Sequence, residues 1–248
     1  WGLQQFRTIN KNKSIFFLGM VSAKLVAEKF YNIPYLFHLK DPQLEIDTSG
    51  KTPDFFWLSN GTMPFLFETK GTAGEKISKH TAKKAKKQLA AISQIEIETD
   101  GPTLMYKTKD IKRHIISSNF VNNTLLYNDI DPEHNGQEKI RLDLNRSILS
   151  CYRHIMWLLN NTNGGYSFGN IKFLVYRSEG YSFGLDKELY DIFLEYQSKT
   201  NSIHSKKYDN TSFSGLYKKY YKRVSKFERF YISIDETISI RWDGIICF

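Results

Sequence analysis

Three charged residues lie at the ends of two short apolar segments of the chain. Asp54 begins one segment, and Glu68 and Lys70 end the other. The turn-forming sequence Ser-Asn-Gly-Thr at 59–62 connects them, so the sequence predicts a β-hairpin. Because the start of one hairpin strand lies beside the end of the other, we expect the three side chains to lie close together. Side chains alternate along a strand, so Glu68 and Lys70 share a face and the side chain of Thr69 turns away.

Two carboxylates in apolar surroundings repel each other, and a hard divalent cation relieves this repulsion. Oxygen ligands suit Mg²⁺, with Mn²⁺ as a substitute, so Asp54, Glu68 and the carbonyl of Thr69 are the predicted ligands. A neighbouring ammonium, that of Lys70, can orient or activate a metal-bound water and stabilise negative charge developing on a phosphate. The three residues therefore indicate metal-assisted hydrolysis of a phosphate ester.

The sequence Pro53-Asp54, followed after an apolar strand by Glu68-Thr69-Lys70, resembles the PD-(D/E)xK nuclease superfamily. The resemblance covers about residues 14–107. It implies a Mg²⁺-dependent endodeoxyribonuclease that leaves a 5′-phosphate and that is suited to restriction or anti-phage defence. Most relatives act on DNA, which is the substrate we expect, although the sequence does not decide between DNA and RNA.

The resemblance also assigns two residues outside the hairpin. Many members of the superfamily place a glutamate on a helix before the motif strands, where it supports the metal site, and Glu28 matches by position. A solvent-facing role for Glu28 is an equally good interpretation. Some members carry a glutamine on the helix after the motif that contacts the active site, and Gln88 is similar in position.

Three other interpretations stay open at this point. The charged residues could be a Glu–Lys pair on a solvated strand end, with Asp54 capping a turn. The chain could be a catalytically inactive nucleic-acid-binding module. It could also be an interaction subunit of a larger complex, such as one that contains an ATPase.

The composition favours a polyanionic partner, because the 248 residues carry a formal net charge of +9. No apolar run approaches the roughly 20 residues that a membrane span needs, so we expect no membrane partner and no signal peptide. Basic residues gather on a predicted helix at 75–95 and, among tyrosines, at 217–223; solvated lysines and packed tyrosines are the alternative. The candidates for nucleic-acid binding are Lys76, Lys79, Lys83, Lys84, Lys87, Lys218, Lys219, Lys222 and Arg223.

The predicted order of elements is typical of an α/β protein. We expect a restriction-endonuclease-like mixed central sheet flanked by helices in a nuclease core at 1–107. A C-terminal α+β extension at 108–248 either completes this core or recognises substrate or partner. In the core, the predicted elements are a helix at 17–31 with an apolar stripe of Leu18, Val21, Leu25 and Val26, strands at 35–40, 51–58, 64–71 and 103–107, and a helix at 75–95. In the extension they are helices at 144–160 and 186–196, a strand at 171–176 and a hairpin at 230–242.

Cys151 and Cys247 lack the spacing of metal ligands, and Cys151 falls in a helical pattern as an expected buried thiol. Their small number fits a reducing cytoplasm. Cutting both strands of a duplex needs two active sites, so a homodimer is the expected assembly, or else membership of a larger one.

Overall fold

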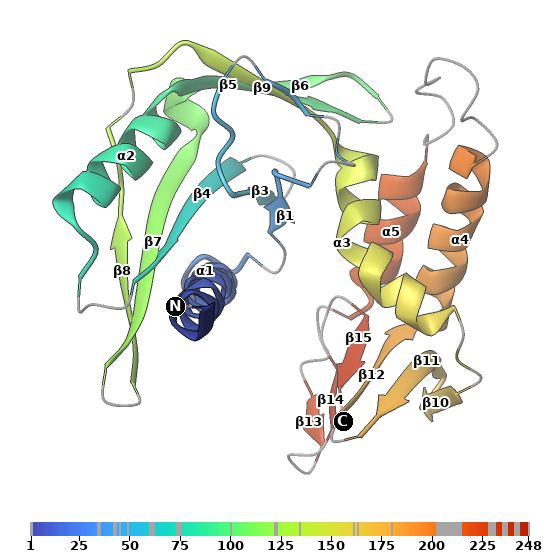
Figure 1. The fold of residues 1–248 in the computed structure, drawn as a ribbon. Helices are drawn as coiled ribbons and strands as arrows, with labels where there is room; N and C mark the ends of the chain where they lie inside the picture. Colours follow the sequence, from blue (N-terminus) through green and yellow to red (C-terminus); the bar gives the residue numbers. More distant parts are fainter. Residues whose placement is uncertain are drawn as a thin grey trace. The chain divides into compact units, whose positions relative to one another are not determined.

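The computed structural model describes the chain in two units, and each is presented by itself (Figure 1). Unit 1 comprises Trp1–Ile97 and Thr103–Leu142, and unit 2 comprises Glu98–Pro102 and Asp143–Phe248. Unit 1 thus extends beyond the domain boundary predicted after residue 107. The residues outside the description are 1, 34–35, 42–43, 45, 49, 60–62, 73–75, 100, 122–123, 134, 161, 163, 180, 202–214, 228–231, 235–237, 241–243 and 248.

The first sheet of unit 1 is mixed, in the strand order β1-β3-β4-β7-β8. The predicted hairpin is confirmed: β3 and β4 are antiparallel, with Phe55 opposite Phe67. Strand β4 also pairs in parallel with β7, which explains why unit 1 continues past residue 107. The strands are β1 (Phe37–His38), β3 (Phe55–Ser59), β4 (Met63–Gly71), β7 (Lys112–Val121) and β8 (Thr124–Ile130).

The second sheet of unit 1 has the order β2-β9-β5-β6. Its strands are β2 (Asp47–Thr48), β9 (Glu138–Asp143), β5 (Ile92–Glu98) and β6 (Leu104–Lys107). The predicted strand at 103–107 exists as β6, but it pairs with β5 and does not join the motif hairpin. The parallel neighbour that we expected for the hairpin is β7.

Helix α2 (Lys79–Ala90) is shorter than the helix predicted at 75–95. Ile92 and Ile95 are three residues apart, which mimics helical spacing, but both belong to β5 and are fully buried there. The N-terminus of α2 is capped by Ser78, whose hydroxyl accepts a hydrogen bond from the backbone N–H of Thr81 at 3.1 Å. The capped helix therefore begins at Lys79, the first lysine of α2.

Helix α1 (Gly2–Tyr31) begins earlier than predicted, and only part of its predicted apolar stripe is buried. Ser22, Ala23, Val26 and Ala27 are buried, whereas Leu25 of the predicted stripe is 52% exposed. Small residues let the helix approach the sheet closely. At Gly19 an added Cβ would lie 2.9 Å from the backbone nitrogen of Gly71, so the helix crosses near the end of β4.

Unit 2 contains a six-stranded sheet in the order β10-β11-β12-β15-β14-β13, together with three helices. The helices predicted at 144–160 and 186–196 are confirmed as α3 (Leu144–Leu159) and α4 (Lys187–Asn201), and α5 is Leu216–Val224. Cys151 is half-buried rather than buried. The strands are β10 (Gly164–Phe168), β11 (Ile171–Ser178), β12 (Tyr181–Asp186), β13 (Ile232–Ile234), β14 (Ile238–Ile240) and β15 (Ile245–Cys247), which include the predicted strand at 171–176 and the C-terminal hairpin.

Across the described residues, no helix combines the length and the hydrophobicity that crossing a membrane requires. The architecture is α/β, with mixed and antiparallel sheets.

Candidate active site

The motif hairpin buries its two carboxylates side by side. Because Phe55 pairs with Phe67, the preceding residue of β3, Asp54, comes to the position beside Glu68. Both acids are only 1% exposed, and Lys70 forms an ion pair with Glu68. The predicted convergence of Asp54, Glu68 and Lys70 at one end of the hairpin is thus present in the fold.

The carboxylate of Asp54 is held by two strands. Its Oδ2 accepts hydrogen bonds from the backbone N–H of Thr69 at 2.7 Å and from the Thr69 hydroxyl at 3.0 Å. Its Oδ1 forms an ion pair with the ammonium of Lys40. The Thr69 side chain therefore contacts Asp54, whereas the sequence predicted that it would turn away from the site.

Glu68 is oriented from the opposite direction by α2. Its Oε2 accepts a hydrogen bond from Nε2 of Gln88 at 2.8 Å, and its Oε1 pairs with Lys70. The same Gln88 nitrogen donates to the carbonyl of Thr52 at 2.6 Å, so Gln88 connects the helix to both sides of the hairpin. This is the contact that the resemblance suggested for Gln88.

Burial changes the proton affinity of this cluster. Desolvation raises the pKa of Glu68 above its ordinary value, and the neighbouring charge of Asp54 raises it further. The hydrogen bond and charge of Lys70 act in the opposite direction but do not cancel this effect. Two buried carboxylates that repel each other in this way are stabilised by nearby positive charge.

Lys40 is the member of the cluster that the sequence did not indicate. It follows β1, which pairs with β3 so that His38 lies opposite Phe55. The backbone N–H of Leu39 also donates to the carbonyl of Asp54 at 2.9 Å, which carries the next residue, Lys40, to the Asp54 carboxylate. The position depends on strand pairing between distant segments, and no local signal at residue 40 reveals it.

His38 lies at the edge of this region. Burial lowers the pKa of its imidazole, and its Nε2 is buried without a hydrogen-bond partner among the described atoms. The ring packs against Phe55, with centroids 5.4 Å apart. It is half-buried beside β3, and its ring contact supports the structural role that is usual for a single strand histidine.

Glu28 is half-buried on helix α1, and its support of the metal site stays a prediction. Helix α1 packs on the sheet face that carries Phe65 and Phe67, and alternation along β4 directs Glu68 to the other face, where α2 lies (Figure 1).

The donor set of the cluster is compatible with a Mg²⁺ ion. Searching the described residues for groups of three or more His, Cys, Asp or Glu side chains that could hold a metal finds none. Mg²⁺ does not need such a group, because it keeps several waters and is commonly held by one or two carboxylates together with substrate phosphates. Asp54 and Glu68 provide this number of carboxylates, and the two lysines match their charge.

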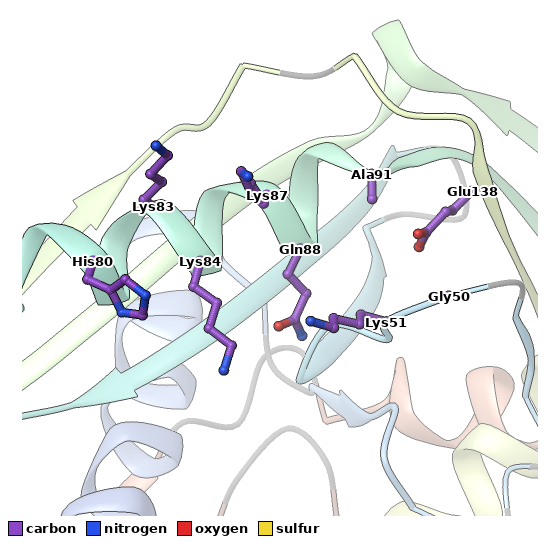
Figure 2. A pocket seen from close by; sticks show the side chains of 9 residues that line it. All are labelled: Gly50, Lys51, His80, Lys83, Lys84, Lys87, Gln88, Ala91 and Glu138. Atoms are coloured by element: carbon purple, nitrogen blue, oxygen red, sulfur yellow. The ribbon is translucent and has the colours of Figure 1, made fainter.

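The predicted basic residues of α2 are exposed, and Lys83, Lys84 and Lys87 border a pocket of about 570 Å³. The pocket lies beneath α2, and Lys84 and Gln88 project into it from the helix, opposite Lys51 (Figure 2). Lys76 and Lys79 are exposed but do not line the pocket. The lining residues are Gly50, Lys51, His80, Lys83, Lys84, Lys87, Gln88, Ala91 and Glu138.

The basic residues of α5 have different surroundings. Arg223 is 8% exposed and binds Asp186 through two hydrogen bonds of 2.8 and 2.6 Å, so it is part of the core of unit 2 and, contrary to the prediction, is not presented to a nucleic acid. Lys219 forms an ion pair with Glu195 at 2.8 Å. Lys218 and Lys222 are exposed.

Comparison with known proteins identifies no relationship: the chain matches no family model, no curated protein and no solved structure. Inferences about function therefore depend on the residues of the site and their geometry.

Proposed function

We propose that this protein is a Mg²⁺-dependent nuclease with a restriction-endonuclease-like core. The observation that carries the proposal is the pair of buried carboxylates, Asp54 and Glu68, next to the ammonium of Lys70. The arrangement of a motif hairpin extended by a parallel strand is compatible with that fold. DNA is the proposed substrate, and restriction or anti-phage defence is the proposed setting, by the resemblance of the motif alone.

Asp54 and Glu68 would hold the metal through Oδ1 and Oε1, the two oxygens that now face lysines. When bound, Mg²⁺ supplies charge neutralisation at the scissile phosphate and lowers the pKa of a coordinated water. The backbone N–H and hydroxyl of Thr69 keep Oδ2 of Asp54 in place, and Gln88 does the same for Oε2 of Glu68. Each carboxylate thus has one oxygen fixed by the protein and one directed at a cation.

Lys70 has the catalytic role in this proposal. Its ammonium is next to Glu68 and 25% exposed, so it can reach a ligand while remaining anchored to the strand. There it positions the attacking water and offsets the negative charge that develops on the phosphate in the transition state. Lys83, Lys84 and Lys87, the exposed lysines of α2 that line the pocket, add an attraction for the nucleic-acid backbone that does not depend on sequence.

The test is cleavage of plasmid DNA, single-stranded DNA and RNA by purified protein with Mg²⁺, with EDTA, and with the Lys70→Ala variant. We expect cleavage that requires Mg²⁺ and that falls at least about 100-fold in Lys70→Ala, as for the loss of a group that stabilises transition-state charge. Lys86→Ala is the matched control, because Lys86 is exposed on α2 and does not line the pocket. Equal cleavage by wild type and Lys70→Ala, or no cleavage of any of the three substrates, would refute the proposal.

A further inference from the structure

The pocket beneath α2 has the size and charge of a site for a phosphorylated ligand. Its volume of about 570 Å³ falls within the range that accommodates small organic ligands, about 300–1,000 Å³. Its lining contains four lysines and His80, and Glu138 is the one acidic residue among the nine. All nine residues belong to unit 1, so the pocket is formed within one compact unit.

The pocket adjoins the carboxylate cluster through a single side chain. His80, Lys84 and Gln88 are spaced by four residues, so they line one side of α2 and face the pocket (Figure 2). Gln88 also donates its hydrogen bond to Glu68 at 2.8 Å. A ligand in the pocket is therefore separated from the catalytic carboxylate by no more than the amide of Gln88.

Glu138 has a feature that repulsion from phosphate alone would not explain. Its Oε2 is buried and has no hydrogen-bond partner among the described atoms, although four lysines line the same pocket. The carboxylate packs against Gly50, where an added Cβ would lie only 2.2 Å from it. A buried acceptor without a donor destabilises the protein, and a ligand that brings an N–H or O–H group would remove that cost.

The backbone holds this carboxylate in position. The N–H of Glu138 donates to the carbonyl of Ala91 at 2.8 Å, and the hydroxyl of Ser93 donates to the carbonyl of Glu138 at 3.1 Å. The preceding Gly136 also donates to the carbonyl of Ala90 at 2.8 Å. The residue is thus fixed to the junction between α2 and β5.

From these observations we propose that the pocket binds one nucleotide of the substrate strand, next to the scissile phosphate. Lys51, His80 and Lys84 contact its phosphate, and Glu138 accepts a hydrogen bond from an N–H of the base or from a sugar hydroxyl. This subsite deepens the proposed nuclease function and rests on it. A ligand that combines phosphate oxygens with a hydrogen-bond donor satisfies both the lysines and the buried Oε2 of Glu138.

The test measures binding in EDTA, so that the result does not depend on hydrolysis. Fluorescence anisotropy compares three labelled single strands of about 12 nucleotides: DNA, RNA and DNA that lacks its bases. For Lys51→Ala combined with Lys84→Ala we expect an affinity about tenfold lower and a shallower salt dependence, because a phosphate contact contributes a slope of about 0.7 on single strands. Lys86→Ala is the control from the same helix and should bind like wild type.

The change in affinity caused by Glu138→Ala distinguishes two roles for the carboxylate. If the carboxylate only repels phosphate, its removal increases affinity for all three strands equally. If the carboxylate accepts a hydrogen bond from the ligand, its removal abolishes a binding preference of up to about tenfold. When the donor is a base, the lost preference is for DNA with bases over abasic DNA. When the donor is the sugar 2′-hydroxyl, the lost preference is for RNA over DNA.

The subsite is overturned if Glu138→Ala leaves both preferences unchanged, or if the Lys51 and Lys84 variant binds like Lys86→Ala. It is supported if one preference is lost and the double variant binds more weakly. Because hydrolysis is absent from the assay, a protein that cuts no substrate but shows these binding changes would refute the nuclease and retain the nucleotide subsite.

Discussion

Lys40 makes the site's most specific prediction, because it occupies the oxygen of Asp54 that a metal would need. The ammonium pairs with Oδ1, while Oδ2 already accepts two hydrogen bonds from Thr69. Metal binding at Asp54 must therefore displace Lys40. Replacing Lys40 with alanine should increase the affinity for Mg²⁺ and decrease the stability of the metal-free protein.

Both effects have the same origin, so they should have similar size. The Lys40 side chain is 43% exposed and the Asp54 side chain 2%, so solvent screens the pair and its contribution must be discounted towards that of a surface pair, about 1 kcal/mol at most. Since 1.4 kcal/mol corresponds to a factor of ten, we expect about fivefold tighter Mg²⁺ binding. In EDTA, the free energy of unfolding should fall by about the same 1 kcal/mol.

Calorimetric titration with Mg²⁺ measures the affinity, and urea unfolding in EDTA measures the stability. Lys70→Ala is the informative comparison, because Lys70 pairs with the other carboxylate, Glu68. Both variants should bind Mg²⁺ more tightly, but only Lys70→Ala should lose hydrolysis. If Lys40→Ala binds Mg²⁺ with unchanged or lower affinity, then Asp54 is not a metal ligand through Oδ1 and the assignment of the site is refuted.

Three further predictions concern Gln88, Arg113 and Glu68 itself. Gln88→Ala should lower the free energy of unfolding by about 2 kcal/mol, measured in urea, because it removes one hydrogen bond to a carboxylate and one to a carbonyl; in a Glu68→Gln background the loss should be smaller. Arg113→Met should cost about 3 kcal/mol or more in the same assay, because the buried guanidinium donates to four backbone carbonyls, including that of Leu89 near the end of α2; a loss below 1 kcal/mol would contradict this. Because the pKa of Glu68 is raised above 4.5, the affinity for Mg²⁺ should decrease as the pH falls through that raised pKa. Over the same fall in pH the free energy of unfolding in EDTA should increase, because the folded state binds this proton more tightly than the unfolded state. The Glu68→Gln variant should show neither trend.

The hairpin and its charged end were predictable from sequence because the relevant information is local. A turn sequence between two apolar segments sets the register, and the register brings Asp54 beside Glu68. Alternation along β4 then places Lys70 on the side of Glu68, where the two form an ion pair. The mixed character of the sheet was also predicted. The identity of the parallel strand was not, because β5 and β6 belong to the second sheet.

The packing of α1 was predicted only in part: Val26 of the apolar stripe is buried, but most of the buried face consists of small residues. An apolar stripe usually marks the face that meets the core, and Leu25 and Val21 belong to such a stripe. Here Gly19 and Ala23 meet the sheet instead, since only small side chains allow the helix to come so near β4.

The energetics of burial supply a reason to look for a ligand at this site. Asp54 and Glu68 are almost completely removed from water, whereas the lysines that pair with them are 43% and 25% exposed. An ion pair with an exposed ammonium offsets little of the free energy lost when a carboxylate is desolvated. Apolar residues of similar volume commonly stabilise a fold as well as a buried ion pair, or better. Stability therefore does not account for two acids at this position. A divalent cation would compensate both charges at once, and the two hydrogen-bonded oxygens, Oδ2 and Oε2, leave one oxygen of each acid for it. This is why the decisive comparison is metal affinity in variants that remove the lysines, rather than the loss of cleavage alone.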